Sequence, residues 1–250
     1  MFAMFGATIL VPILVNSYFE SSSQVLSVQV TLFCAGIGTL FFHLCSKFKV
    51  PAFLGSSFAF LGGFGTVANL DSGMYANMPD IEKLQYACGG IVVAGLLYLI
   101  LALIIKLAGV KRVMRFLPPV VTGPIIICIG LSLAPSAVSN ASTNWLIALV
   151  ALAVIIIFNI WGKGMFKIIP ILLGVVISYA FAFILNSFGV TNPDGSAILD
   201  FTNVASASIV GLPPFRICKF DLTAIYVMAP IAIATMMEHI GDMSAISATV

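Results

Sequence analysis

The chain has 250 residues, of which 61% are hydrophobic and only 8% are charged, and its formal net charge at pH 7 is +2. A soluble domain has about 45–50% apolar and about 25% charged residues, so this composition excludes an ordinary soluble fold. Apolar runs of about 20 residues recur along the chain, and each is long enough to cross a hydrocarbon core of about 30 Å. The sequence therefore predicts an all-α polytopic membrane protein in a lipid bilayer. The basic residues lie in short loops between the spans, so the net charge says nothing about nucleic acid, and no nucleic-acid partner is predicted.

Eight hydrophobic spans are predicted in chain order. They cover about residues 1–17, 24–46, 50–66, 84–106, 116–136, 143–162, 166–187 and 222–250. The connections after the second, fourth and sixth spans carry no acidic residue but eight basic ones, namely Lys47, Lys49, Lys106, Lys111, Arg112, Arg115, Lys163 and Lys167. The other connections carry only Lys83, Arg216 and Lys219 as bases. Because basic loops stay on the cytoplasmic side, we expect a cytoplasmic N-terminus in a multi-pass protein of the cell membrane.

The third span, "VPAFLGSSFAFLGGFGTV" (50–67), is unusually rich in Gly, Ser and Pro. Glycine and proline are poor helix formers, and non-helical backbone at membrane depth must face protein or a watery cavity. One interpretation is a kinked helix whose glycines let neighbouring helices approach closely. The other is a broken span whose open backbone groups contact a substrate, as in many secondary transporters. The sequence leaves both open and favours the broken span.

The last span places three ionisable residues close together, because "ATMMEHIGDM" (234–243) contains Glu238, His239 and Asp242. Glu238 and Asp242 are four residues apart and share one helix face, whereas His239 lies about 100° around the helix. A helix end at the water interface would explain such a cluster, but 16 residues from Leu222 to Met237 precede it within the span. Ionisable residues inside a membrane usually mark a solute or proton path.

The longest polar connection, about 188–221, separates seven spans from the eighth. We therefore predict a seven-span unit over 1–187, an outside connection over 188–221 and a further span over 222–250. No phosphate-binding loop, nucleophile elbow or HExxH motif is present, and "EHIGD" lacks the second histidine of a metalloprotease. The five scattered cysteines predict no disulfide framework and no zinc site. The sequence thus predicts neither an enzyme nor a metal or other cofactor.

Three segments, "FAMFGATILVP" (2–12), "VPAFLGSSFAF" (50–60) and "EHIGD" (238–242), resemble in order and spacing the uracil permeases of the nucleobase–ascorbate transporter family. The likeness covers essentially the whole chain and includes "FLPPVVTG" (116–123) and "GLPPF" (211–215). It implies a fold of fourteen spans in two inverted seven-span repeats, with the third and tenth spans partly extended. On that basis this chain holds the first repeat and the start of the second.

The resemblance also implies roles for individual residues. Glu238 matches the carboxylate that binds the nucleobase ring, Phe58 of "GSSFAF" would touch the base, and Ala7 of "FGAT" would pack on it. Asp242, with Glu238 and His239, would take part in proton coupling. The Gln-His pair that usually precedes the first motif is absent, and so is the tenth span with its second substrate-binding carboxylate. Residues 1–250 alone are therefore not expected to bind or transport a nucleobase.

The sequence and the resemblance together predict a proton-coupled transporter that imports a nucleobase, with uracil as the first choice. The alternatives are a transporter of xanthine or another small solute or anion on the same fold, or a channel. A carboxylate and freed backbone amides suit a ring with two N–H donors and two C=O acceptors. The sequence does not decide whether the substrate is a purine or a pyrimidine, or whether the coupling ion is a proton or sodium. It also does not decide whether the protein is a homodimer or a monomer.

Overall fold

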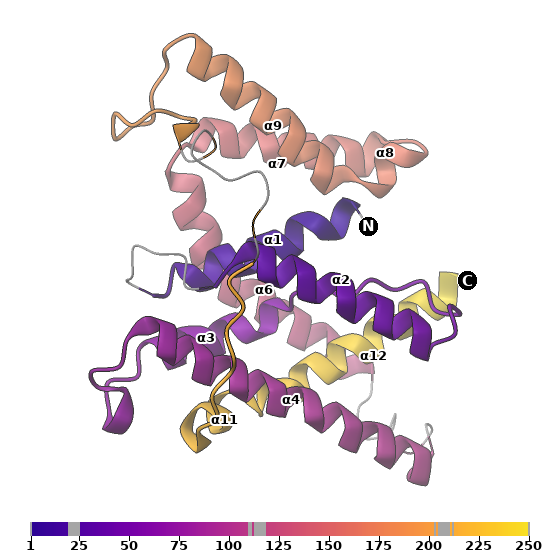
Figure 1. Ribbon diagram of the computed structural model, residues 1–250. Coiled ribbons are helices and arrows are strands. Elements are labelled where there is room, and N and C mark those ends of the chain that lie inside the picture. The colour runs from indigo at the N-terminus through magenta and orange to yellow at the C-terminus, as the bar shows by residue number, and fades with distance from the viewer. Residues whose placement is uncertain are drawn as a thin grey trace. The chain divides into compact units, whose positions relative to one another are not determined.

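The computed structural model describes most of the chain as helices joined by short connections (Figure 1). The described residues are 2–19, 26–109, 112, 119–202, 204, 211 and 213–249. The helices are α1 (Phe2–Asn16), α2 (Val28–Cys45), η1 (Phe58–Phe60), α3 (Leu61–Ala68), η2 (Gly73–Tyr75), α4 (Asp80–Ala108), α6 (Pro119–Ser142), α7 (Trp145–Trp161), α8 (Met165–Ile168), α9 (Pro170–Ser187), α11 (Leu222–Met228) and α12 (Ile231–Thr249). In the described part, β pairing amounts to one isolated bridge between Thr191 and Ala197.

Five of the described stretches are long and apolar enough to cross a membrane. They are Val28–Cys45, Asp80–Ala108, Gly123–Ser142, Pro170–Ser187 and Leu222–Met243. Two shorter apolar stretches, Phe58–Ala68 and Trp145–Trp161, fall at the predicted third and sixth spans. The prediction of an all-α polytopic membrane protein is confirmed. The predicted start of the fifth span near 116 lies outside the described residues, and its helix runs on to Ser142.

The third span is broken, as predicted, but only over its first half. Residues 50–57 form no helix, and helical turns begin with η1 and continue through α3. Side-chain hydroxyls satisfy part of this irregular backbone. Thr39 Oγ1 accepts from the N–H of Leu54 at 3.0 Å and donates to its carbonyl at 3.2 Å. Ser57 Oγ accepts from the N–H of Ala59 at 3.3 Å and caps η1.

The prediction of a broken span is wrong for its second half. Gly62, Gly63 and Gly65 do not break the helix but lie within helix α3. Gly63 serves close packing: a Cβ atom there would lie 2.6 Å from Met228 Sδ, below any normal contact. Gly90 of α4 has the same role, since its Cβ atom would lie 2.8 Å from the Ala224 carbonyl oxygen. Helix α11 thus packs against both α3 and α4, and the Met228 side chain is fully buried.

The eighth span is interrupted, because α11 ends at Met228 and α12 starts at Ile231. Pro230 lies between them and has no N–H to donate to a helix ladder. Hydrogen bonds of the 3₁₀ type, between residues three apart, close the turn. The N–H of Ala232 donates to Ala229 O at 3.1 Å, and the N–H of Ile233 donates to Pro230 O at 3.1 Å. The break at Ala229 and Pro230 lies a little more than two turns before Glu238, the first residue of the ionisable cluster of α12.

The contacts divide the chain into two compact units, each made of three chain segments. One unit comprises Met1–Ile9, Gly36–Gly55 and Ala134–Pro213, and the other comprises Leu10–Ala35, Ser56–Leu133 and Pro214–Val250. Within the first unit α7 and α9 lie side by side (Figure 1), and Gly174 of α9 approaches Ile155 of α7. The predicted division of the chain at 187 and 221 is not tested by this grouping and stays a prediction.

Polar contacts in the second unit hold the connections at the ends of α3, α4 and α11. The buried Lys83 Nζ donates to the Ala68 carbonyl at 2.9 Å and lies 3.7 Å from Asp71 Oδ1. The buried Tyr75 donates its hydroxyl to Asp221 Oδ2 at 2.9 Å, and Asp221 also accepts from the N–H of Thr223 and so caps α11. A cap and a buried hydroxyl bond together fix the start of α11.

Two glycine substitutions on α4 should have opposite effects on the stability of the complete protein. Gly90→Ala places a methyl group against the Ala224 carbonyl, so we expect a loss of roughly 1–3 kcal/mol through overpacking. Gly95→Ala meets nothing within 4 Å and should be neutral or stabilising by up to about 1 kcal/mol, because alanine favours helix over glycine. Thermal unfolding in detergent measures both, and equal effects would contradict the close contact of α4 with α11.

The Tyr75–Asp221 bond should make stability depend on pH in a defined way. Burial alone raises the pKa of Asp221, but the hydrogen bonds from Tyr75 and Thr223 outweigh it and hold that pKa below its ordinary value. Burial raises the pKa of Tyr75, and its bond to Asp221 raises it further. The stabilisation is therefore complete between the ordinary pKa values, about 3.9 and about 10, and is lost as pH falls through the lowered pKa of Asp221 or rises through the raised pKa of Tyr75.

The test is the melting temperature from pH 3 to pH 9 for the parent and for Asp221→Asn. The difference should be largest near neutral pH and should shrink below about pH 4. Tyr75→Phe keeps the buried ring, removes the hydroxyl and should give the same pattern. A difference that stays constant from pH 3 to pH 8 would show that the bond contributes nothing that depends on ionised Asp221.

Candidate functional site

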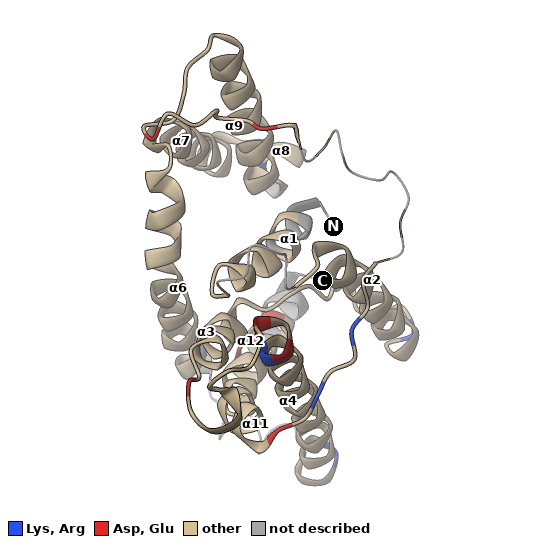
Figure 2. Ribbon diagram, turned by 60° about the vertical axis from the view of Figure 1, so that its left-hand side comes forward, with Lys and Arg blue, Asp and Glu red and all other residues tan. Residues whose placement is uncertain are grey.

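Helix α12 carries the three ionisable residues that the sequence singled out. Glu238 is half-buried, whereas His239 and Asp242 are exposed in this structure. The two carboxylates are four residues apart and therefore lie one turn apart along the helix. Charged residues are few along the described ribbon, most of which is uncharged (Figure 2). Glu238 interacts electrostatically with both His239 and Asp242. The three groups therefore form one charged cluster, as the spacing predicts.

Packing brings η1, the helical end of the broken third span, against the helix that carries this cluster. Ala94 of α4 and Ala232 and Met236 of α12 form a small buried core, and Phe60 of η1 packs on it. The alanines let α4 and α12 approach closely. The helical end of the third span and the second half of the eighth span thus lie against each other in the second unit.

Phe58 and Ala7 are placed differently from Glu238. Phe58 lies at the start of η1, half-buried, and its side chain packs on the larger core around Leu61 and Met228. Its predicted contact with a substrate stays a prediction. Ala7 belongs to α1, but its side chain lies outside the described residues. Of the predicted site residues, the structure therefore groups Glu238, His239 and Asp242 next to the element that carries Phe58.

Two further residues belong to this cluster, and the sequence reasoning missed both. Tyr98 of α4 donates its hydroxyl to Thr235 Oγ1 at 2.7 Å and lies 2.8 Å from His239 Nδ1. Its ring is 5.5 Å from the His239 ring, centroid to centroid. Thr235 is fully buried and stands one turn before His239. Two features of the sequence could have indicated these residues. One is a tyrosine in the middle of an apolar span, and the other is a threonine four residues before a histidine.

The carboxylates keep acceptor capacity for a ligand. Within the described part of the chain the ion pairs are Lys83 with Asp71 and Lys219 with Glu82, and neither reaches α12. An ionised carboxylate is an acceptor only and can take hydrogen bonds from two N–H groups. Among the described residues, no group of three or more His, Cys, Asp or Glu side chains could hold a metal ion. An ionised carboxylate of this cluster can thus accept hydrogen bonds from N–H donors.

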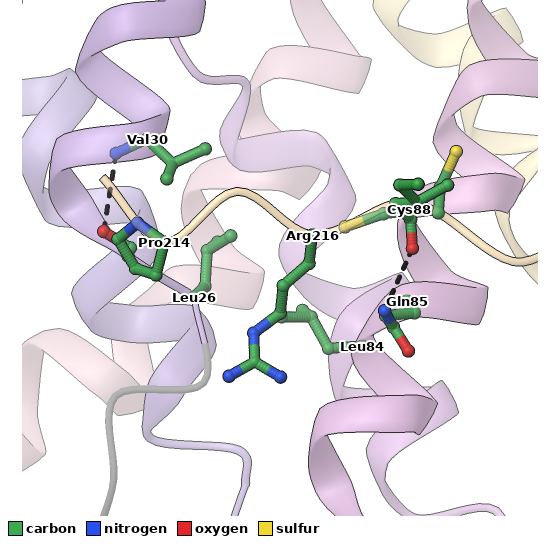
Figure 3. Close-up of a pocket in the computed structure, with 10 residues that line it drawn as sticks. Leu26, Val30, Leu84, Gln85, Cys88, Pro214 and Arg216 are labelled. Carbon is green, nitrogen blue, oxygen red and sulfur yellow. Dashed lines mark hydrogen bonds between the residues drawn. The ribbon is translucent and has the colours of Figure 1, made fainter. Parts of the chain in front are cut away.

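A small cavity of about 100 Å³ lies in another part of the second unit, between α2, α4 and residues 214–218 (Figure 3). Its walls include Leu26, Leu84 and Cys88, and Arg216 extends along it. Cys88 and Tyr98 are ten residues apart on α4, which corresponds to about 15 Å along a helix. The cavity is thus separate from the carboxylate cluster.

The comparison with protein families matches the entire chain. The family model named Xan_ur_permease, described as "Permease family", matches residues 1–250. The uracil permease of Bacillus caldolyticus is 37% identical over 265 residues, which cover 100% of this chain and 54% of that protein. The uracil permease of Bacillus subtilis (strain 168) is 36% identical over 269 residues, with 100% and 55% covered.

A third relative carries a broader name. The putative pyrimidine permease RutG of Escherichia coli (strain K12) is 33% identical over 250 residues, covering 98% of this chain and 52% of that protein. The chain thus spans about half the length of these relatives. The match over every residue, with the sequence motifs and the helical fold, shows that the chain belongs to this permease family.

Proposed function

We propose that the complete protein is a proton-coupled secondary transporter that imports a nucleobase, with uracil as its substrate. The observation that carries this proposal is the half-buried Glu238 on α12, the helix that packs against η1 at the helical end of the third span. Intramembrane carboxylates usually face a solute or proton path, and broken spans provide backbone groups for substrates. The names of the relatives, uracil permease and pyrimidine permease, support a pyrimidine.

The chemistry of uracil fits the groups present. The ring offers two N–H donors and two C=O acceptors in one plane. Glu238 would accept from the ring N–H groups through its carboxylate oxygens, and backbone N–H groups near Phe58 would donate to the ring carbonyls. Phe58 and Ala7 would pack on the ring faces. A planar ring with both donors and acceptors satisfies a site in which a carboxylate meets open backbone.

Proton coupling would use the ionisable groups of α12. Glu238, His239 and Asp242 lie within two turns of that helix. Asp242 is one turn away from Glu238 and exposed, a position suited to passing a proton on rather than binding the ring. His239 would act as a further proton acceptor.

The membrane arrangement is part of the same proposal. The excess of basic residues after the second, fourth and sixth spans supports a cytoplasmic N-terminus in the cell membrane. Residues 1–187 would form the first seven-span repeat, 188–221 an outside connection, and 222–250 the first span of the second repeat.

Uptake of radiolabelled uracil by cells that make the complete protein tests this function. Import should saturate with uracil, collapse when the proton gradient is dissipated, and be competed by unlabelled uracil more strongly than by xanthine. Stronger competition by xanthine would assign a purine substrate instead. Uptake that rises linearly with concentration would indicate a channel, and dependence on a sodium gradient would replace the proton as the coupling ion.

Glu238→Gln should weaken uracil binding to the complete protein without preventing membrane insertion. The amide keeps the shape of the side chain but loses the charge and one acceptor oxygen. A charge-assisted hydrogen bond contributes about 1.5–3 kcal/mol, so we expect an increase in Kd of about 10- to 150-fold. Equilibrium binding of labelled uracil in detergent measures it. Glu82→Gln, which alters the Lys219 ion pair away from α12, is the matched control. Unchanged binding would remove Glu238 from the site.

Asp242→Asn should impair coupling more than binding, because Asp242 lies one turn beyond the proposed binding carboxylate. We expect uracil affinity within about threefold of the parent, while uptake loses its dependence on external pH and falls by about tenfold or more. Uptake at a series of external pH values measures both effects. Asp200→Asn, at an exposed residue of the connection before α11, should leave the profile as in the parent. A parental profile for Asp242→Asn would exclude the relay role.

A further inference from the structure

Tyr98 of α4 contacts His239, a member of the charged cluster of α12. Its hydroxyl oxygen lies 2.7 Å from Thr235 Oγ1 and 2.8 Å from His239 Nδ1. Thr235 and His239 are one turn apart on the same helix face, so one hydroxyl reaches both. Ala94, one turn before Tyr98, packs with the buried Ala232, and this close contact of the helices sets the position of the tyrosine.

The pattern of donors and acceptors, with the Thr235 hydroxyl donating to the Ala232 carbonyl, points to where the histidine proton lies. Thr235 uses its only hydroxyl hydrogen to donate to the Ala232 carbonyl at 3.0 Å. Thr235 Oγ1 must therefore accept from Tyr98, whose single hydroxyl hydrogen is then committed. The Tyr98 oxygen has only lone pairs left for the histidine. His239 Nδ1 must then carry a hydrogen and donate it to Tyr98.

We propose that Tyr98 is a positioning residue that holds His239 in the Nδ1-protonated form, so that the histidine takes up and releases a proton only at Nε2. Neutral His239 then offers the Nε2 lone pair as an acceptor. A proton added there gives the imidazolium, and its departure restores the same tautomer. The Tyr98–Thr235 pair keeps its hydrogens throughout. The order of bonds runs from His239 through Tyr98 and Thr235 to the backbone of Ala232.

The charged and titratable groups around His239 are few in the described part of the second unit. On α12 they are Glu238 and Asp242, and on α4 the facing group is Tyr98. Residues Phe58–Phe60 of η1, which also packs on α12, contain no titratable side chain. Proton exchange at Nε2 is therefore directed to the two carboxylates or to groups that approach α12 from elsewhere. Because the tautomer is fixed, His239 exchanges its proton at Nε2 in every transport cycle.

The direct test is ¹⁵N NMR of the complete protein with labelled histidine, at a pH where His239 is neutral. The His239 signals are assigned from their disappearance in His239→Gln. The parent should show Nδ1 protonated and Nε2 unprotonated. The opposite tautomer, or an equal mixture of the two, would overturn the proposal without the need for any further variant.

Substitutions at Thr235 sharpen the test, because they change which atom receives the tyrosine hydrogen. Thr235→Val removes the acceptor and leaves the Tyr98 hydroxyl free to donate to His239 Nδ1. The tautomer should then invert to Nε2-protonated. Thr235→Ser keeps the hydroxyl and should keep the parental tautomer. An unchanged tautomer in Thr235→Val would contradict the assignment of hydrogens.

The link to transport rests on the proposed function and is measured separately. Tyr98→Phe should leave uracil affinity within about threefold of the parent, but reduce proton-driven uptake by about tenfold and alter its pH profile, because proton transfer loses its oriented partner. Tyr226→Phe, at an exposed tyrosine of α11, is the matched control. If the predicted tautomer is found but no nucleobase is transported, the proposed function is wrong, whereas the role of Tyr98 in positioning His239 is confirmed. If uptake and its pH profile are unchanged in Tyr98→Phe, the role in coupling is wrong.

Discussion

The close packing of α11 between α3 and α4 is the contact on which the arrangement of the candidate site depends. Gly63 and Gly90 remove the side chains that would keep α11 at a normal distance, and Met228 fills the space between them. Because α12 follows α11 after the turn at Pro230, this contact also fixes where α12 begins. The small residues Ala94 and Ala232 then continue the close approach along α4. Helix association in a membrane relies on such packing, since lipid supplies no hydrophobic drive between helices.

A second constraint is the need to satisfy polar groups where water is absent. Backbone released from a helix costs several kcal/mol per unmet group in hydrocarbon. The extended stretch 50–57 is supported by hydroxyls, with Thr39 bonding both backbone groups of Leu54 and Ser57 capping η1. The same need explains the Tyr98–Thr235 pair, in which each buried or half-buried hydroxyl has a partner. Polar side chains in these spans thus form hydrogen bonds with the backbone and with His239 in the structure without a substrate.

Family membership and the geometry of α12 address different questions. The match of the whole chain to the permease family gives the general class of the protein. The structure adds that the carboxylate Glu238 is half-buried on α12, which packs against η1, whereas Asp242 is exposed one turn on. It also adds a tyrosine, Tyr98, that no motif marked. The division of labour proposed for the three ionisable residues of α12 follows from these differences in burial and partners.

The sequence by itself determined the helical membrane class, the position of the spans, the break near Pro51 and the cluster of α12, because composition, apolar length and residue spacing act locally along the chain. It could not decide which glycines break a helix and which let helices meet: Gly63 lies in a regular helix and serves packing. It also did not show the interruption at Pro230 or the partner of His239. The partner of His239 depends on contacts between α4 and α12, through residues more than 130 positions apart. Such pairs form only once small residues on both helices allow the backbones to approach, and no local pattern contains that information.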